Sequence, residues 1–129
     1  MEIVLLVGRI VFGGFFIMSG INHFQNLDVM SGFAKSKNVP FPRVAVIGTG
    51  VMLVVGGSSV LLGIVPIVGL IVLILFLLST LVTMHDFWNL QDPQRRAVDQ
   101  VHFLKNVALI GASLALMYGA SDWVLAFYA

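Results

Sequence analysis

The sequence contains no cysteine, and only 10% of its residues are charged. Without cysteine the chain cannot form a disulfide, cycle a thiol through redox states or bind a metal through thiolates. A soluble domain carries about 25% charged residues, whereas 59% of this chain is hydrophobic. A small domain leaves much of its surface in water, so 129 residues cannot hide that much apolar surface in a soluble fold. The composition therefore predicts an integral membrane protein.

Several site types are also missing. The formal net charge is only +1 and no basic stripe is present, which argues against nucleic-acid binding. The many glycines lack the strand–turn–helix context of a phosphate-binding loop. Neither His85 nor His102 belongs to a recognised metal-ligand spacing, and Lys105 would repel a cation, so no metal site is expected and haem is disfavoured.

Four apolar runs are long enough to cross a bilayer as helices, since a hydrocarbon core of about 30 Å needs about 20 helical residues. Between the first two runs, Val29, Met30, Phe33 and Ala34 recur at helical spacing and predict a short interfacial helix. The fold class is therefore all-α, an integral membrane four-helix bundle with that short helix between spans 1 and 2. One domain, residues 1–129, would contain spans at about 3–21, 44–62, 67–84 and 101–118.

The segments between the spans predict the topology. The short uncharged turn at residues 63–66 predicts an antiparallel hairpin of the second and third spans. Residues 89–100 are the most hydrophilic segment and are expected outside the hydrocarbon. Most basic residues fall on the side of the first and third connections, which the positive-inside rule places in the cytoplasm with both termini outside. These residues are Lys35, Lys37, Arg43, Arg95, Arg96 and Lys105.

Polar residues gather where three spans reach the same membrane face. They end the first span, end the third and begin the fourth, and they include all three histidines: Asn22, His23, His85, Asp86, Trp88, His102, Lys105 and Asn106. Two interpretations are open. These side chains are ordinary interfacial residues that cap helices and meet head groups, or they line a polar pocket that opens to the cytoplasm. Adjacent helical residues diverge by about 100°, so His85 and Asp86 imply no acid–base pair.

The first span carries a lone arginine. Arg9 shares one helical face with Gly13, Phe16, Gly20 and His23. Arg9 either snorkels to the head groups or points into the bundle, where Asp122 or the C-terminal carboxylate is a candidate partner.

Glycine is frequent in the first span, at Gly8, Gly13, Gly14 and Gly20. Small residues let helix backbones approach closely in lipid, so these positions indicate close helix packing. Glycine is also simply common in membrane helices, and the sequence leaves that alternative open.

The order and spacing of these motifs resemble the DoxX-like family of small four-helix membrane proteins. The resemblance rests on Arg9, residues 19–24 (SGINHF), the stretch 32–34 (GFA) with 39–42 (VPFP), the glycines 56, 57 and 63, and residues 102–106 (HFLKN). It implies the fold, together with uneven biochemistry: relatives are linked to thiosulfate:quinone oxidoreduction, to complexes that handle oxidative stress, or to export and assembly. Residues 52–55 (MLVV) offer no carboxylate where many relatives carry a glutamate.

We therefore expect a small subunit of a redox or respiratory-type complex in a prokaryotic inner membrane, accessory to a quinone-linked oxidoreductase. A polar pocket at the cytoplasmic face would bind a quinone or similar amphiphile, and the electron-transfer cofactor would belong to the partner. The candidate ligand-binding residues are His23, His85, Asp86, Trp88, His102, Lys105, Asn106 and Arg9. The alternative is a non-enzymatic structural or assembly subunit whose glycine-rich helices pack against a larger membrane protein or a second copy. A transporter or channel is less favoured, because the spans contain no acidic residue before Asp86.

Overall fold

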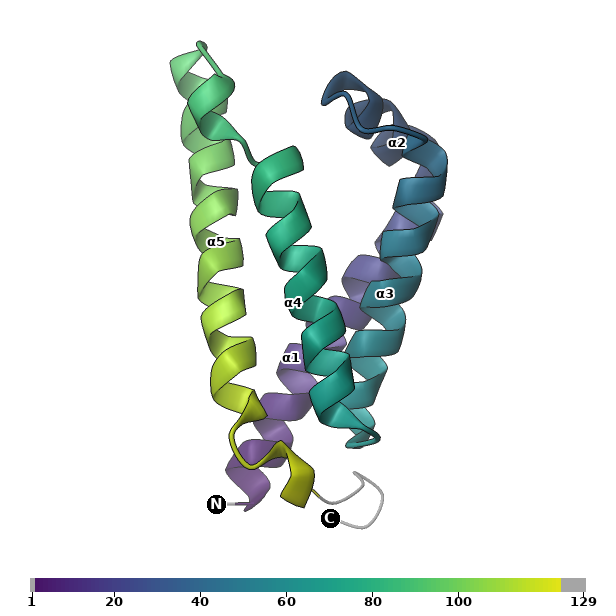
Figure 1. The fold of residues 1–129 in the computed structure, drawn as a ribbon, viewed down its shortest axis with the longest axis vertical. Coiled ribbons are helices and arrows are strands. Elements are labelled where there is room, and N and C mark those ends of the chain that lie inside the picture. Colours follow the sequence, from purple (N-terminus) through teal and green to yellow (C-terminus); the bar gives the residue numbers. More distant parts are fainter. Residues whose placement is uncertain (1, 124–129) are drawn as a thin grey trace.

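The computed structural model describes residues 2–123, which form helices joined by short connections (Figure 1). In chain order these are α1 (Glu2–Gln25), α2 (Leu27–Ser36), α3 (Pro42–Leu62), α4 (Pro66–Thr83), the 3-10 turn η1 (Phe87–Asn89), α5 (Pro93–Met117) and the 3-10 turn η2 (Ala120–Asp122). Of the described helices, α1, α3, α4 and α5 are long and apolar enough to cross a membrane. The predicted all-α fold, with a short helix between the first two spans, is confirmed.

Proline fixes where three of the long helices begin. Pro42, Pro66 and Pro93 each stand at the start of a helix, where the missing amide hydrogen costs nothing. Before α5, the side chain of Asp92 accepts a hydrogen bond from the backbone amide of Gln94 at 3.2 Å, which caps the helix. Helix α5 therefore begins at Pro93, within the hydrophilic segment and about two turns before Val101.

The turn between α3 and α4 is short and makes the two helices antiparallel neighbours, as the sequence predicts. Gly63 adopts a left-handed conformation with φ 73°, and its amide donates to the carbonyl of Ser59 at 3.0 Å. We call this end of the molecule, where η2 and the start of α1 also lie, the termini end (Figure 1). The opposite end holds α2 and the α4–α5 connection, and we call it the polar end.

The buried face of α1 is the one that the spacing predicts. Arg9, Gly13, Phe16, Gly20 and His23 are the buried residues of this helix, and the residues between them are partly or fully exposed. The arginine therefore points into the bundle and does not snorkel to the head groups.

Glycine lets α1 and α3 pack backbone against backbone. A Cβ added at Gly13 would lie 2.6 Å from the carbonyl oxygen of Gly57, and one added at Gly57 would lie 2.7 Å from that of Gly13. Gly20 is similarly close to Gly50. Close packing is thus confirmed at Gly13 and Gly20, whereas a Cβ at Gly8 or Gly14 would meet nothing within 4 Å.

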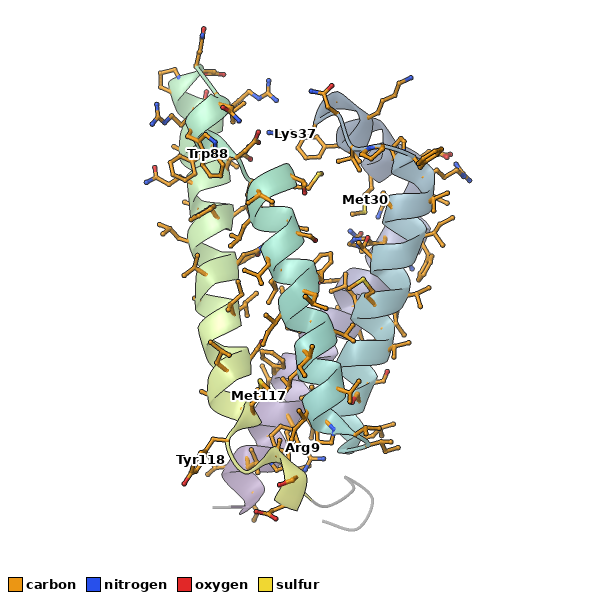
Figure 2. The ribbon with its side chains drawn as sticks, in the orientation of Figure 1. Arg9, Met30, Lys37, Trp88, Met117 and Tyr118 are labelled. Atoms are coloured by element: carbon orange, nitrogen blue, oxygen red, sulfur yellow. The ribbon has the colours of Figure 1, made fainter. Side chains whose placement is uncertain are left out.

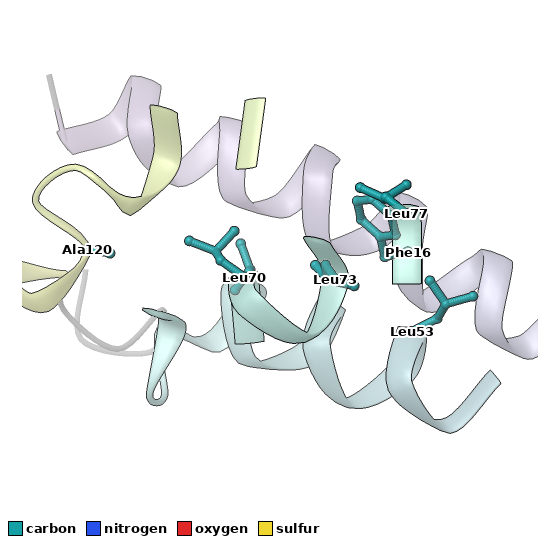
Figure 3. Packing of buried hydrophobic residues seen from close by; sticks show 7 residues of the cluster. Phe16, Leu53, Leu70, Leu73, Leu77 and Ala120 are labelled. Carbon is teal, nitrogen blue, oxygen red and sulfur yellow. The ribbon is translucent and has the colours of Figure 1, made fainter. Parts of the chain in front are cut away.

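The buried apolar cluster joins α1, α3, α4 and η2 (Figure 3). Its members are Phe16, Leu53, Val60, Leu70, Leu73, Leu77 and Ala120. Helix α5 contributes no fully buried apolar residue, and its two buried residues are Asn106 and Ser113. Its outward-facing residues, such as Val101 and Leu114, are exposed and apolar, which suits contact with lipid. Helix α5 packs against the cluster with partly buried apolar residues, Leu109, Ile110, Leu116 and Met117, and its fully buried residues are polar.

Candidate functional site

A cavity of about 180 Å³ lies among α1, α3, α4 and α5 toward the polar end. We call it the inner cavity. Its polar lining comes from Ser19, Asn22, His23, Thr80, His85, Lys105 and Asn106. Its apolar lining comes from Phe15, Phe16, Leu53, Phe76, Leu77 and Leu109. Four of the eight predicted site residues, His23, His85, Lys105 and Asn106, thus meet in one cavity.

His23 has a defined orientation at the end of α1. Its Nδ1 lies 2.8 Å from the carbonyl oxygen of Ser19, one turn earlier in the helix. A carbonyl only accepts, so Nδ1 carries a hydrogen and donates it. In the neutral ring Nε2 then keeps its lone pair. The side chain is 9% exposed and offers the cavity a hydrogen-bond acceptor.

Asn106 is fixed by a bond between α5 and α4. Its Nδ2 donates to Thr80 Oγ1 at 2.7 Å, and Thr80 Oγ1 in turn donates to the carbonyl of Leu77 at 3.0 Å. The asparagine is 3% exposed, so its amide is held in one orientation, with Oδ1 as a further acceptor. Lys105, the preceding residue, is exposed and brings a cationic donor to the rim of the cavity.

His85 and His102 stack on each other. Their ring centroids are 5.3 Å apart and the planes differ by 24°. Both rings line a second cavity of about 520 Å³ at the surface of the polar end, which we call the outer cavity. Its other lining residues are Phe33, Gln94, Arg95, Val98 and Asp99. His102 thus belongs to the outer cavity, whereas His85 lines both.

Asp86 takes part in an ion cluster that the sequence did not reveal. Lys37, just after α2, places Nζ 2.8 Å from Asp86 and 3.3 Å from Asp99 of α5. Figure 2 shows Lys37 reaching between α2 and the α4–α5 side of the molecule. Burial disfavours the ammonium, but its hydrogen bonds to both carboxylates and their charges outweigh this and raise the pKa of Lys37. Asp86 therefore closes the polar end and does not line the inner cavity.

Trp88 lies in η1, on the outside of the polar end. Its ring packs edge-on against Phe87 and Phe103, with centroids 5.5 and 5.7 Å away. It is 48% exposed (Figure 2) and lines neither the inner nor the outer cavity. Tryptophan at such a position is typical of the membrane–water interface.

A third space, the side groove, runs between α2, α3 and α4. Its volume is about 350 Å³, and Met30, Phe33, Val39, Val46 and Met84 give it an apolar lining. The side groove shares His23, Phe76, Thr80 and His85 with the inner cavity. A polar cavity and an apolar groove therefore lie on the two sides of the same residues.

Arg9 is at the termini end, away from the three spaces (Figure 2). It is 2% exposed, its Nε donates to the carbonyl of Val60 at 3.2 Å, and its guanidinium lies 5.0 Å from the ring centroid of Trp123. A second donor reaches Leu61 at 3.4 Å. Carbonyls at a helix C-terminus carry partial negative charge and suit a cation. Within residues 2–123, Arg9 forms no ion pair with Asp122, and the C-terminal carboxylate lies outside the described residues.

Sequence reasoning missed Lys37, Thr80 and Asp99. The ion-pair partners of Lys37 are 49 and 62 positions away, and no local pattern links them. Thr80 lies within an apolar helix together with Ser79 and Thr83, and no sequence pattern distinguishes its hydroxyl from theirs. The start of α5, in contrast, could have been predicted from Asp92 and Pro93, because a capping residue followed by proline marks the start of a helix.

The family model of DoxX matches residues 4–86. The chain belongs to the DoxX family. The match covers α1 to α4 and ends at Asp86, so it includes His23 and His85 but not α5 with His102, Lys105 and Asn106. Neither a search of curated proteins nor one of solved structures found a match. Family membership and four apolar helices make this chain an integral membrane protein.

Proposed function

We propose that this DoxX protein binds the head group of a quinone, or a similar amphiphile, in the inner cavity. The observation that carries the proposal is the meeting of His23, Lys105 and Asn106, from two different helices, around one cavity beneath the polar end. His23 and Asn106 are buried, and buried polar groups in a membrane protein are costly and often mark functional sites. The cavity pairs them with aromatic and aliphatic walls, as ligand sites do.

The inner cavity is large enough for the head group of a quinone. An engineered apolar cavity of about 150 Å³ holds benzene, so about 180 Å³ accommodates a single substituted ring. The polar lining matches the two chemical states of such a ring. Lys105 can donate to a carbonyl oxygen, whereas His23 Nε2 and Asn106 Oδ1 can accept from a hydroxyl.

The side groove would hold the isoprenoid tail of the quinone. It is apolar, shares four residues with the inner cavity and lies between helices that face the bilayer. An isoprenoid tail in this groove would stay in apolar surroundings while the ring sits among polar groups. Met30 and Met84, which line it, are flexible and adapt to irregular ligands.

Titration with short-chain benzoquinones tests this function. We expect saturable quenching of tryptophan fluorescence in detergent-solubilised protein, with Trp88 as the reporter at the polar end. A benzoquinone with an isoprene unit should bind more tightly than its tail-less analogue. Loss of one hydrogen bond of about 1 kcal/mol should weaken binding about fivefold in each of His23→Gln and Asn106→Ala.

His102→Gln is the matched control, because it changes a histidine that lines only the outer cavity. Its affinity should equal that of the wild type. Quenching that does not saturate, or His23→Gln and Asn106→Ala variants that bind as the wild type does, would contradict the proposal.

The same proposal includes the setting. The chain would serve as a membrane subunit beside a redox partner that carries the electron-transfer cofactor, in a prokaryotic inner membrane. The polar end, with Lys37, Arg95 and Arg96, would face the cytoplasm by the positive-inside rule. Purification in mild detergent tests the partnership: a stoichiometric partner bearing flavin, haem or iron–sulfur supports it, and a chain recovered alone contradicts it.

A further inference from the structure

His85 occupies a unique place among the three spaces. Within the described residues, it is the only one that lines the inner cavity, the outer cavity and the side groove together. It is also the only described residue that the inner and outer cavities have in common. Its side chain therefore forms the wall between a membrane-embedded polar cavity and the aqueous surface.

Within residues 2–123, the backbone of His85 is hydrogen-bonded on both sides, whereas its ring nitrogen Nδ1 is not. The backbone amide donates to the carbonyl of Thr80 at 3.0 Å, and the carbonyl accepts from the amide of Phe87 at 2.9 Å. In contrast, Nδ1 is buried and has no hydrogen-bond partner among the described residues. A buried nitrogen without a partner is costly and calls for an explanation. Stacking on His102 orients the plane of the His85 ring without forming a hydrogen bond to its nitrogens.

Charged and titratable groups surround His85 from each element packed against it. Asp99, His102 and Lys105 approach from α5, and Lys37 approaches from the end of α2. Asp86 follows it in the chain and binds Lys37, and His23 of α1 lies across the inner cavity. The outer side therefore offers a carboxylate and a second imidazole, and the inner side offers the acceptor Nε2 of His23.

We propose that His85 carries protons between the outer cavity and the inner cavity. Histidine suits this task, because either ring nitrogen can hold the proton near neutral pH. One proton from water in the outer cavity binds one ring nitrogen, and the opposite nitrogen releases its own proton to an acceptor in the inner cavity. Reorientation or tautomer exchange of the ring returns it to its first state, and no electron moves. The route does not rest on the quinone proposal, since any polar occupant of the inner cavity would use it.

Solvent exchange at His23 tests the route in ligand-free protein. His23 Nδ1 donates its hydrogen to the carbonyl of Ser19, and uptake of a proton at Nε2, on the cavity side, makes that hydrogen labile, so its exchange with water reports proton delivery to the inner cavity. The probe is ¹⁵N-histidine-labelled protein in lipid nanodiscs, with magnetisation transfer from water as the readout. The chain has only three histidines, so single replacements assign the signals.

We expect His85→Phe and His85→Gln each to slow this exchange about 100-fold, the lower range for a positioned proton carrier. Trp88→Phe is the control, because it changes an aromatic residue at the same end that lines neither cavity. An unchanged backbone amide signal of His23, the histidine of α1, would show that the variants fold, and if one variant does not fold the other decides. Exchange that stays as fast as in the wild type, or becomes faster, would overturn the proposal and indicate entry elsewhere, such as beside Asn22. Because no quinone is added, this result is independent of the binding titration.

Discussion

At the scale of single residues, the Asn106–Thr80 bond is a buried polar link between α5 and α4. Helix α5 buries only Asn106 and Ser113, and Ser113 bonds within its own helix. Among the described residues, Asn106 is thus the one α5 side chain that forms a hydrogen bond with another spanning helix. Interhelical hydrogen bonds in membranes average about 0.6 kcal/mol and reach about 1.7 kcal/mol. The short distance and deep burial place this bond at the upper end.

A double-mutant cycle measures the Asn106–Thr80 bond. Asn106→Ala and Thr80→Val should each destabilise the protein, and their coupling energy should lie near 1.5 kcal/mol, at the upper end of the range for such bonds. Equilibrium unfolding in mixed detergent is the measurement. Ser113→Ala is the matched control and should show no coupling to Thr80→Val. A coupling energy near zero for the first pair would show that the bond does not hold α5.

The sequence predicted the candidate site only in part, because it does not determine how individual side chains are oriented. Spacing along helices placed His23 on the buried face of α1, and topology brought His85, Lys105 and Asn106 to the same end. Spacing could not separate His85 from His102, because the boundary between two cavities depends on side-chain orientation. It also gave no sign that Asp86 turns toward Lys37, since that ion pair joins segments that are distant in the sequence.

At the scale of elements, the α1–α3 crossing depends on missing side chains. Gly57→Ala should cost about 1–3 kcal/mol, the usual penalty for overpacking, because the new methyl would meet the Gly13 carbonyl at 2.7 Å. Gly14→Ala is the matched control on α1, where a Cβ meets nothing within 4 Å. That change should be neutral or stabilise the helix by about 0.5–1 kcal/mol. Unfolding measurements that rank the two variants equally would contradict the backbone contact.

The Lys37 ion cluster is the second element-scale feature, since it ties the end of α2 to α4–α5. Lys37→Met should destabilise the protein by about 1–3 kcal/mol, because two partly buried carboxylates would lose their shared cation. The raised pKa of Lys37 sets the pH dependence. The stabilisation by the Lys37 cluster is complete at pH values below the pKa of Lys37 in the unfolded chain, about 10.5. It disappears as the pH rises through the higher pKa that Lys37 has in the folded protein.

Thermal unfolding of wild type and Lys37→Met at neutral pH, at about pH 9 and at about pH 11 checks this. The difference in unfolding temperature between the wild type and Lys37→Met should be the same at neutral pH and at about pH 9, and smaller at about pH 11. Arg43→Met is the control, because the Arg43–Asp28 pair is exposed and such pairs contribute little. A difference that already disappears at about pH 9 would contradict the raised pKa.

The elements themselves were largely readable from the sequence. Long apolar runs gave the spanning helices, and the spacing of Arg9, Gly13, Phe16, Gly20 and His23 gave the buried face of α1. The start of α5 was not recognised, because hydropathy finds where a helix enters lipid and not where it begins in water. Capping by Asp92 extends the helix into the hydrophilic segment.

At the scale of the whole molecule, the absence of cysteine makes the orientation directly measurable. Asn38 follows α2 at the polar end, Ser121 lies in η2 at the termini end, and both positions are exposed, so each can be replaced by cysteine. In intact inner-membrane vesicles, a membrane-impermeant thiol reagent should label Ser121→Cys from the side away from the cytoplasm and Asn38→Cys from the cytoplasmic side. Labelling of both from the same side would contradict the four-span arrangement, and the reverse pattern would invert the proposed orientation.

The turn at Gly63 joins two long helices at one end of the molecule, so a small change in the angle between them becomes a larger displacement at the other end. Helices α3 and α4 meet at this turn and diverge toward the polar end (Figure 1). Because α4 has 18 residues and a helix rises about 1.5 Å per residue, a tilt of about 5° at the turn moves its far end by about 2 Å. Such a tilt would move the residues beside Gly63 least and those near His85 and Asp86 most. A small change in tilt would therefore alter the spacing of α3 and α4 at the polar end, where the side groove lies, and leave the turn itself almost unmoved.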